Sequence, residues 1–216
     1  MERKSAVIFD LDGVLWRSSA AHEKAYREAF ESIGIRAFSY RRFAGVRTDE
    51  VVDTVASENN VPLSAAERAR IIDRKRKLAR VYLETETAVD PIVVQVISFL
   101  SPHYRMAIAT SASQRTLGIF LNKSGLGSHF SALLSGEDVS QGKPDPEIYL
   151  LASQRLGLPP AATWTVEDAV EGIRSGKTAG STVVGVTGLY SSEELLEAGA
   201  AYVVADIGEL RELFMP

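Results

Sequence analysis

Short apolar runs alternate with helical stretches through most of this chain, and this alternation constrains the fold most strongly. Strands are predicted at 6–9, 105–110, 131–134, 163–166, 182–186 and 201–204. From Asp90 onward the segments between them have helical periodicity over about 10–15 residues each. Strands joined by helices form a parallel sheet with right-handed crossovers. We therefore expect an α/β protein whose core is a doubly wound, Rossmann-like parallel sheet.

Residues 20–87 interrupt this pattern with helices alone. One of these helices is expected over 48–58, with Thr48 as its N-cap. Ser64 and Glu67 have the spacing of a capping box, and they open a long helix that runs to about Glu86. The predicted division is a core made of 1–17 and 88–216, with an inserted all-helical cap at 18–87.

Composition excludes several classes of function. The 216 residues carry a net charge of −4, which argues against a general nucleic-acid binder, and they contain no cysteine for a disulfide or thiolate metal site. No signal peptide or membrane span is recognised, so a cytoplasmic monomer without membrane contact is expected. The segment 18–86 holds 13 Lys/Arg against 11 Asp/Glu, whereas the remainder is acidic. A basic insert over an acidic core would suit an anionic substrate, and chance variation of surface charge explains it equally well.

The first predicted strand ends in two carboxylates. Asp10 and Asp12 follow the apolar run 6–9, and Gly13 then allows a sharp turn. Ligands of open α/β sheets bind just outside the carboxyl ends of the strands. The pair is typical either of a turn at a strand end or of a site for a metal ion and a phosphate.

Other strand ends carry polar groups as well. Hydroxyls and backbone N–H groups follow the second strand at 110–113, where they could form an oxyanion cradle or a plain helix N-cap. Lys143, between Gly142 and Pro144, is either a fixed charge for phosphate or an exposed loop residue. Glu167 and Asp168 end the strand at 163–166. Carboxylates converging on one place repel unless a cation lies among them, and Mg²⁺ prefers such oxygen ligands.

The segment 172–178 looks at first like a nucleotide-binding P-loop. It has three residues between its glycines instead of four, and it lies within a helical pattern. We therefore expect an ordinary helix there, with Lys177 on its surface.

Four motifs together resemble those of the haloacid dehalogenase-like superfamily. They are FDLDGV at 9–14, ATSAS at 109–113, GKPDPEIY at 142–149 and WTVEDAVEGI at 164–173. Their order, and the helical insert after the first strand, are similar to the β-phosphoglucomutase-like phosphatases of that superfamily. The resemblance covers essentially the whole chain.

The resemblance implies a role for each core residue. Asp10 matches the nucleophile that forms an aspartyl-phosphate, and Asp12 matches the general acid/base. Ser111 and Lys143 match the groups that bind the transferring phosphoryl group and neutralise its charge, with Ala112 and Ser113 beside them in the substrate site. The Mg²⁺ ligands would be the Asp10 carboxylate, the Asp12 carbonyl and Asp168, with Glu167 binding directly or through water.

The cap offers further candidates for substrate binding. His22 matches a cap histidine of the resembled proteins, although its apolar stripe is also typical of a semi-buried histidine. Arg47 matches a substrate-binding arginine. Lys75 lies on the inward stripe of its helix and is expected either to face the cleft or to reach solvent from the stripe edge. The neighbouring side chains Arg74, Arg76 and Lys77 are expected to point elsewhere.

The linker between core and cap departs from the resembled pattern. Arg17, preceded by Trp16, stands where many members of the family have an acidic residue.

Three functions remain open. The leading hypothesis is a Mg²⁺-dependent phosphatase of small phosphorylated metabolites, with sugar phosphates as one class. The second is a β-phosphoglucomutase-type mutase that uses the same site. The third is a non-catalytic phospho-acceptor module, which would need no cap of this size.

Overall fold

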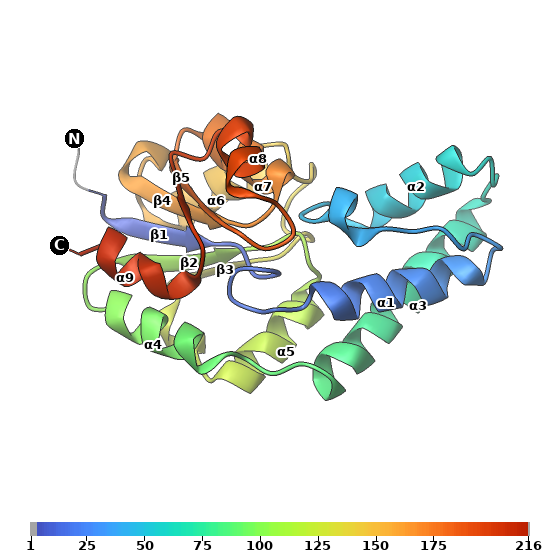
Figure 1. Cartoon of the computed structure of the whole chain (residues 1–216), viewed down its shortest axis with the longest axis horizontal. Helices are drawn as coiled ribbons and strands as arrows, with labels where there is room; N and C mark the ends of the chain where they lie inside the picture. Colours follow the sequence, from blue (N-terminus) through green and yellow to red (C-terminus); the bar gives the residue numbers. More distant parts are fainter. Residues whose placement is uncertain (1–3, 216) are drawn as a thin grey trace.

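A six-stranded, fully parallel sheet forms the centre of the protein in the computed structural model, which describes residues 4–215 (Figure 1). The strand order is β3-β2-β1-β4-β5-β6. The strands are β1 (Ala6–Phe9), β2 (Arg105–Ala109), β3 (Ala132–Leu134), β4 (Thr163–Glu167), β5 (Thr182–Val186) and β6 (Tyr202–Val204). The chain therefore runs outward from β1 on one side and returns to add β4 on the other. The carboxyl ends of β1 and β4 meet where this direction reverses, which is the usual ligand position in such sheets.

Helices cover both faces of the sheet. On one face lie α4 (Pro91–Leu100), α5 (Gln114–Ser124) and α9 (Leu210–Leu213); on the other lie α6 (Glu147–Leu156), α7 (Val170–Ala179) and α8 (Ser192–Ala198). The side chains of β1 alternate between the two faces, because Val7 and Phe9 join the α4 side of the core while Ala6 and Ile8 join the α6 side. Short 3₁₀ turns occur at Tyr40–Phe43, Gly127–His129, Pro160–Ala162 and Ile207–Glu209.

Three helices between β1 and α4 form the cap. They are α1 (Ser19–Glu31), α2 (Thr48–Glu58) and α3 (Ala65–Thr85), and they lie beyond the carboxyl ends of the strands (Figure 1). The cap has an apolar cluster of its own, in which Tyr26 stacks on Phe30 with ring centroids 5.8 Å apart. The predicted fold class, a Rossmann-like core with a helical cap, is confirmed. The division at residues 17/18 and 87/88 stays a prediction.

Most predicted element positions agree with the structure to within one or two residues. The capping box is present, since Ser64 accepts from the Glu67 amide and Glu67 accepts from the Ser64 amide. The prediction of Thr48 as an N-cap was wrong: Arg47 occupies the cap position, and Thr48 is the first helical residue. The segment that resembles a P-loop lies within α7, and Lys177 is exposed there, as predicted.

Two linkers join the cap to the core, and the residues that depart from the family pattern lie in the first. Trp16 is buried and packs on Phe120, with ring centroids 5.9 Å apart. Arg17 is exposed and approaches Asp206 at 3.4 Å and Asp90, in the second linker, at 3.8 Å. Exposed ion pairs of this kind stabilise a fold by about 0–1 kcal/mol.

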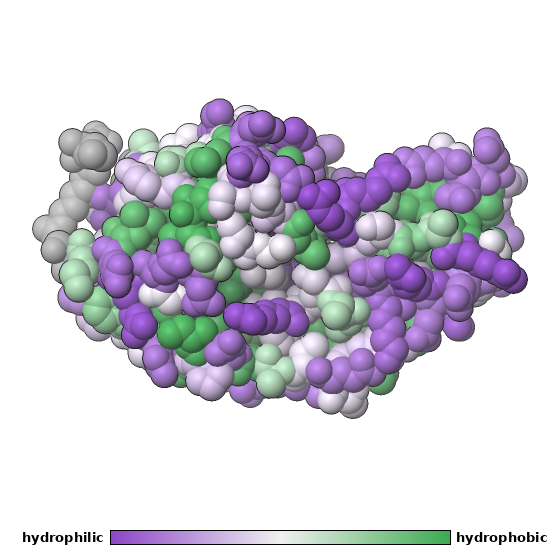
Figure 2. All heavy atoms as spheres, in the orientation of Figure 1, coloured by the Kyte–Doolittle hydropathy of each residue, from purple (hydrophilic) through white to green (hydrophobic). Residues whose placement is uncertain are grey.

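The surface over the cap is mostly hydrophilic, and it is hollowed where cap and core meet (Figure 2). Among the residues that the structure describes, no helix combines the length and apolar character needed to cross a membrane.

We predict that Gly172→Ala destabilises the protein, although alanine normally favours a helix. A Cβ at Gly172 in α7 would lie 1.9 Å from the Glu167 carboxylate at the end of β4. We expect urea unfolding to show a loss of about 2–3 kcal/mol. The matched control is Gly118→Ala in α5, where nothing lies within 4 Å of the new Cβ. That change should be neutral or stabilise the protein by up to about 1 kcal/mol. Equal effects of the two substitutions would contradict the predicted contact.

Candidate functional site

The candidate active site begins at a buried lysine at the carboxyl edge of the sheet. The Lys143 ammonium donates to Asp10 Oδ1 at 2.5 Å, to Glu167 Oε1 at 2.6 Å and to the Ala109 carbonyl at 3.1 Å. All three of its N–H bonds are therefore satisfied by groups that end β1, β4 and β2. The side chain of Lys143 is fully buried, so the expectation of an exposed loop lysine is excluded.

Glu167 is held from several sides. The Tyr149 hydroxyl donates to the same Oε1 atom at 2.6 Å, and the amides of Asp168 and Ala169 donate to Oε2 at 3.1 and 3.3 Å. The Lys143 ammonium also lies 4.9 Å from the centre of the Tyr149 ring. Glu167 thus fixes Lys143 in place, and Tyr149 fixes Glu167.

Three buried carboxylates gather beside this lysine. Asp10, Glu167 and Asp168 each offer an oxygen within 4.8 Å of the others. Burial raises the pKa of Asp10 to about 8, against the opposing charge of Lys143, and burial raises the pKa of Asp168 well above its usual value. The three carboxylates repel one another when they are ionised. A divalent cation among them would offset this repulsion and favour their ionised forms. The oxygen-only donor set therefore fits Mg²⁺.

Gly13 makes room for these carboxylates. Its φ of +92° is in the left-handed region, and a Cβ there would lie 1.9 Å from Asp168 Oδ2. The turn after β1 can therefore approach the acidic cluster only because this residue has no side chain.

The side chain of Asp12 contacts residues of the cap and its linker, whereas that of Asp10 contacts Lys143. Its Oδ1 accepts from the Ser18 hydroxyl at 2.5 Å and lies 3.1 Å from His22 Nε2. Burial acts to raise the pKa of Asp12, but the His22 ring and the two hydrogen bonds outweigh it and lower this pKa below its usual value. We therefore expect Asp12 to be ionised at neutral pH.

Lys75 extends this chain of contacts into the cap. Its ammonium lies 3.3 Å from His22 Nδ1, 3.4 Å from Thr48 Oγ1 and 4.1 Å from the centre of the Tyr26 ring. Burial lowers the pKa of Lys75 to about 8, although the charge of Asp12 opposes this. The His22 ring thus lies between Lys75 and Asp12, with one ring nitrogen facing each. Lys75 is buried and faces the cleft, so it does not reach solvent from the stripe edge.

The segment after β2 lies on the opposite side of the pocket from the cap lysine. The Ser111 hydroxyl donates to the Gly45 carbonyl of the cap at 2.6 Å. The Ala112 amide donates to Thr110 Oγ1, and Ser113 caps α5 by accepting from the Thr116 amide. The expected helix cap is thus confirmed at Ser113, whereas the oxyanion cradle stays a prediction.

Arg47 is in the pocket, but its guanidinium is already engaged. It pairs with both oxygens of Asp49, at 3.2 and 3.0 Å, and donates to the carbonyls of Val139 and Ser140 at 3.4 and 3.1 Å. In this arrangement Arg47 joins the cap to the core.

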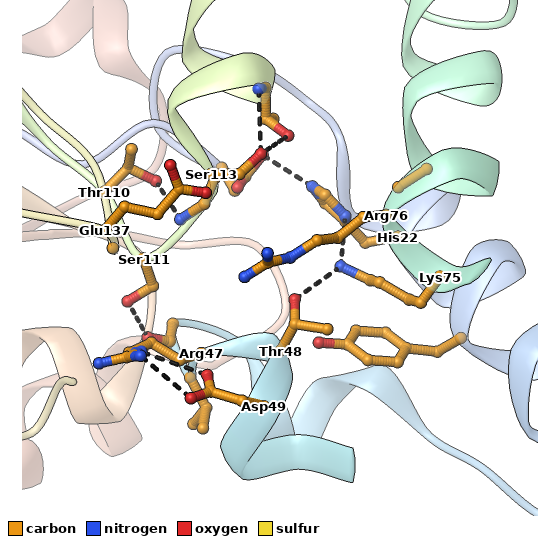
Figure 3. Close-up of a pocket in the computed structure, with 18 of the residues that line it drawn as sticks. His22, Arg47, Thr48, Asp49, Lys75, Arg76, Thr110, Ser111, Ser113 and Glu137 are labelled. Atoms are coloured by element: carbon orange, nitrogen blue, oxygen red, sulfur yellow. Dashed lines mark hydrogen bonds and ion pairs between the residues drawn. The ribbon is translucent and has the colours of Figure 1, made fainter. Parts of the chain in front are cut away.

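Residues of the core and of the cap line one pocket between them (Figure 3), among them Asp10, Asp12, His22, Arg47, Lys75 and the segment 110–113. Lys143, Glu167 and Asp168 are buried beside Asp10 and are not part of this lining. The pocket contains about 680 Å³ of space, its open mouth included, but only about 40 Å³ of this space admits the centre of a water molecule. That is room for a few waters. The cap therefore lies close over the core, and a ligand larger than a few waters needs a wider pocket than this one.

Arg76 corrects one prediction from the sequence. It was expected to point away from the cleft, yet it lines the pocket and extends into it from α3 (Figure 3). The apolar stripe of α3 marks the buried Lys75, but a long side chain one position further can still reach sideways over the cleft. Tyr149, Ser18, Thr48 and Glu137 were also not assigned to the site; Tyr149 lies within the GKPDPEIY motif, whereas the others carry no signal of their own.

Comparisons with known proteins agree with this geometry. The family model of the haloacid dehalogenase-like hydrolases matches residues 4–180. The chain belongs to this family. A phosphorylated carbohydrates phosphatase from Thermotoga maritima is 34% identical over 92% of this chain and 93% of its own. The predicted membership of the haloacid dehalogenase-like phosphohydrolases is thus confirmed.

Solved structures share the whole architecture. A hydrolase from Pseudomonas syringae is 26% identical, with a TM-score of 0.88 over 97% of this chain and 98% of its own. A β-phosphoglucomutase from Clostridium difficile has a TM-score of 0.85 at 24% identity, over 96% of this chain and 93% of its own. The second likeness shows the fold alone.

We predict that Mg²⁺ stabilises the protein more at pH 8 than at pH 5.5. The folded chain keeps a proton on Asp10 that the unfolded chain has lost, because folding raises the pKa of Asp10 from 3.8 to about 8. Without metal, the free energy of unfolding therefore falls as the pH rises from about 4 to about 8, between the two pKa values of Asp10. Mg²⁺ must displace the same proton, so it binds better at high pH. In thermal melts at constant ionic strength, saturating Mg²⁺ should raise Tm by about 5 °C or more at pH 8.

At pH 5.5 the same Mg²⁺ concentration should have a much smaller effect. Asp168→Asn, which removes one oxygen charge from the acidic cluster, is the control and should abolish the difference. An equal Mg²⁺ effect at both pH values would contradict this account of the site.

Proposed function

We propose that the protein is a Mg²⁺-dependent phosphatase of small phosphorylated metabolites, with sugar phosphates as the substrate class. The observation that carries the proposal is the contact between Lys143 and Asp10 at the carboxyl end of the central strand. It fixes Asp10 Oδ1, while Oδ2 has no hydrogen bond to the residues that the structure describes and the Asp10 side chain lines the pocket. The similarity to the T. maritima phosphatase supports the choice of phosphorylated carbohydrates.

In this proposal Asp10 is the nucleophile. Its carboxylate attacks phosphorus, the bond to the alcohol oxygen breaks, and an aspartyl-phosphate forms. Lys143 offsets the charge on the nucleophile and the phosphoryl oxygens, while the Ser111 hydroxyl and the Ala112 amide hold the phosphoryl group. Ser111 would exchange its hydrogen bond to the Gly45 carbonyl, and Ala112 its bond to Thr110 Oγ1, for bonds to substrate.

Asp12 is the proposed acid and base. Binding of the negatively charged phosphate raises the pKa of Asp12, which takes up a proton from solvent. Asp12 gives this proton to the departing alcohol oxygen and then takes one from the water that attacks the aspartyl-phosphate. Ser18 and His22 hold its carboxylate in place, and Lys75 holds the His22 ring. When Mg²⁺ is bound by Asp10, Asp168 and the Asp12 carbonyl, with Glu167 direct or through water, it supplies charge neutralisation for the approach of carboxylate to phosphate.

The cap, proposed to span residues 18–87, would close over the substrate and exclude bulk water. A phosphosugar mutase remains the second candidate, because the closed pocket leaves room for only a few waters and this would protect a phospho-enzyme. A non-catalytic phospho-acceptor is disfavoured, since His22, Thr48 and Lys75 of the cap converge on the same pocket as Asp10.

We predict that Asp10→Asn abolishes hydrolysis of p-nitrophenyl phosphate and of sugar phosphates. The amide is nearly isosteric but is a poor nucleophile, so kcat/KM should fall by a factor of about 1,000 or more. Asp73→Asn, an exposed carboxylate on α3 that pairs with Lys77 at 2.7 Å, is the control and should keep wild-type activity. Full activity of Asp10→Asn would exclude the proposed mechanism.

A separate assay distinguishes phosphatase from mutase. We expect steady release of inorganic phosphate from sugar phosphates, and no conversion of β-glucose 1-phosphate to the 6-phosphate when the enzyme is primed with the bisphosphate. Conversion faster than phosphate release would replace the phosphatase with the mutase as the function of this site.

A further inference from the structure

The cations of the pocket differ in how fully they are engaged. Arg47 has four hydrogen bonds, to Asp49 and to two carbonyls of the core. Lys75 is buried between His22, Thr48 and the Tyr26 ring. Arg47 thus has one of its five N–H donors, and Lys75 one of its three, without a hydrogen bond to the residues that the structure describes. Neither can bind an anion through two parallel hydrogen bonds without giving up a contact in the structure.

Arg76 is different. Its side chain extends from α3 into the middle of the pocket (Figure 3), and it has no hydrogen bond or ion pair with any residue that the structure describes. Five N–H donors therefore face the cleft without a protein partner. Glu137 lines the same pocket from the loop after β3, and its carboxylate is also unpaired within residues 4–215. The two charges do not form an ion pair with each other.

The position of Arg76 indicates which part of the substrate it meets. The phosphoryl group would be held beside Asp10, Ser111 and Lys143, at the edge of the sheet. The departing oxygen would face Asp12, which is connected through His22 to Lys75 on α3. Arg76 follows Lys75 on that helix, so it lies on the side toward which the alcohol part of the substrate extends.

We propose that Arg76 is a specificity-determining residue that binds a second anionic group on the alcohol part of the substrate. The ligand chemistry is a carboxylate or a second phosphate, because a guanidinium binds both through two parallel hydrogen bonds. The negative charge of Glu137 lies in the same pocket and repels this anionic group. Glu137 therefore reduces the preference for substrates that carry a second anionic group over those that do not. The inference rests on the proposed function and narrows its substrate class to sugar-acid phosphates and sugar bisphosphates.

The test compares pairs of substrates that differ in one charged group. 6-Phosphogluconate and glucitol 6-phosphate share an open chain and differ by a carboxylate. Ribulose 1,5-bisphosphate and ribulose 5-phosphate differ by a phosphate, so the two pairs distinguish the two sources of the anion. We expect the wild type to prefer the more anionic member of at least one pair. Arg76→Gln should lower kcat/KM for that member by about 10- to 100-fold and leave the other member within about threefold.

Two further variants serve as controls. Arg74→Gln makes the same charge change on α3 outside this pocket and should behave as the wild type. Glu137→Gln should raise kcat/KM for the more anionic member, because it removes a competing charge. If Arg76 instead only joined the cap to Glu137 on closure, both variants would slow both members equally, and the inference would be overturned.

Binding measurements test the role of Arg76 independently of whether the protein is a phosphatase. Calorimetric titration of Asp10→Asn and of Asp10→Asn/Arg76→Gln with both members of each pair reports on Arg76 even if no ester is hydrolysed. We expect Arg76→Gln to weaken binding of only the more anionic member. Equal binding of the two members in both pairs, or equal weakening of the two, overturns the assignment. Selective binding without turnover of any ester by the wild type would overturn the proposed function alone.

Discussion

The arrangement of the site depends on one buried ammonium between two buried carboxylates. Lys143 joins Asp10 at the end of β1 to Glu167 at the end of β4, and these strands meet where the winding of the sheet reverses. Removing one partner of a buried ion pair typically costs about 3–5 kcal/mol, because the other charge is left unpaired. Tyr149 donates to the same Glu167 oxygen as Lys143, and the amides after β4 donate to the other. Asp10, the proposed nucleophile, is thus positioned by residues of the core.

In the proposed mechanism, the cap and its first linker position the acid/base, Asp12. Ser18 and His22 approach Asp12 only because the first linker and α1 lie over the carboxyl end of β1. The Ser111 hydroxyl and the Arg47 guanidinium, by contrast, hold the cap closed through backbone carbonyls across the cleft. Entry of substrate must break these contacts, so binding and cap movement are coupled.

Much of the core could be predicted from the sequence, because the carboxyl ends of parallel strands share one edge. This brought Asp10 and Asp168 together without any knowledge of tertiary contacts. The capping box at Ser64 was equally predictable, since it is local. The burial of Lys143 was not, because a loop lysine has no periodicity that marks it as inward. The direction of Arg76 was also missed, since a helical stripe gives the face of the backbone and not the reach of a long side chain.

The most direct test of the account is to find where the phosphoryl group goes. Enzyme turning over p-nitrophenyl phosphate with Mg²⁺ is quenched in acid, digested and analysed by mass spectrometry. We expect a phosphoryl group on the peptide that contains Asp10, and more of it in Asp12→Asn, which forms the intermediate but hydrolyses it slowly. Continued turnover with no covalent phosphate on Asp10 in either protein, or with phosphate on another residue, would contradict the account.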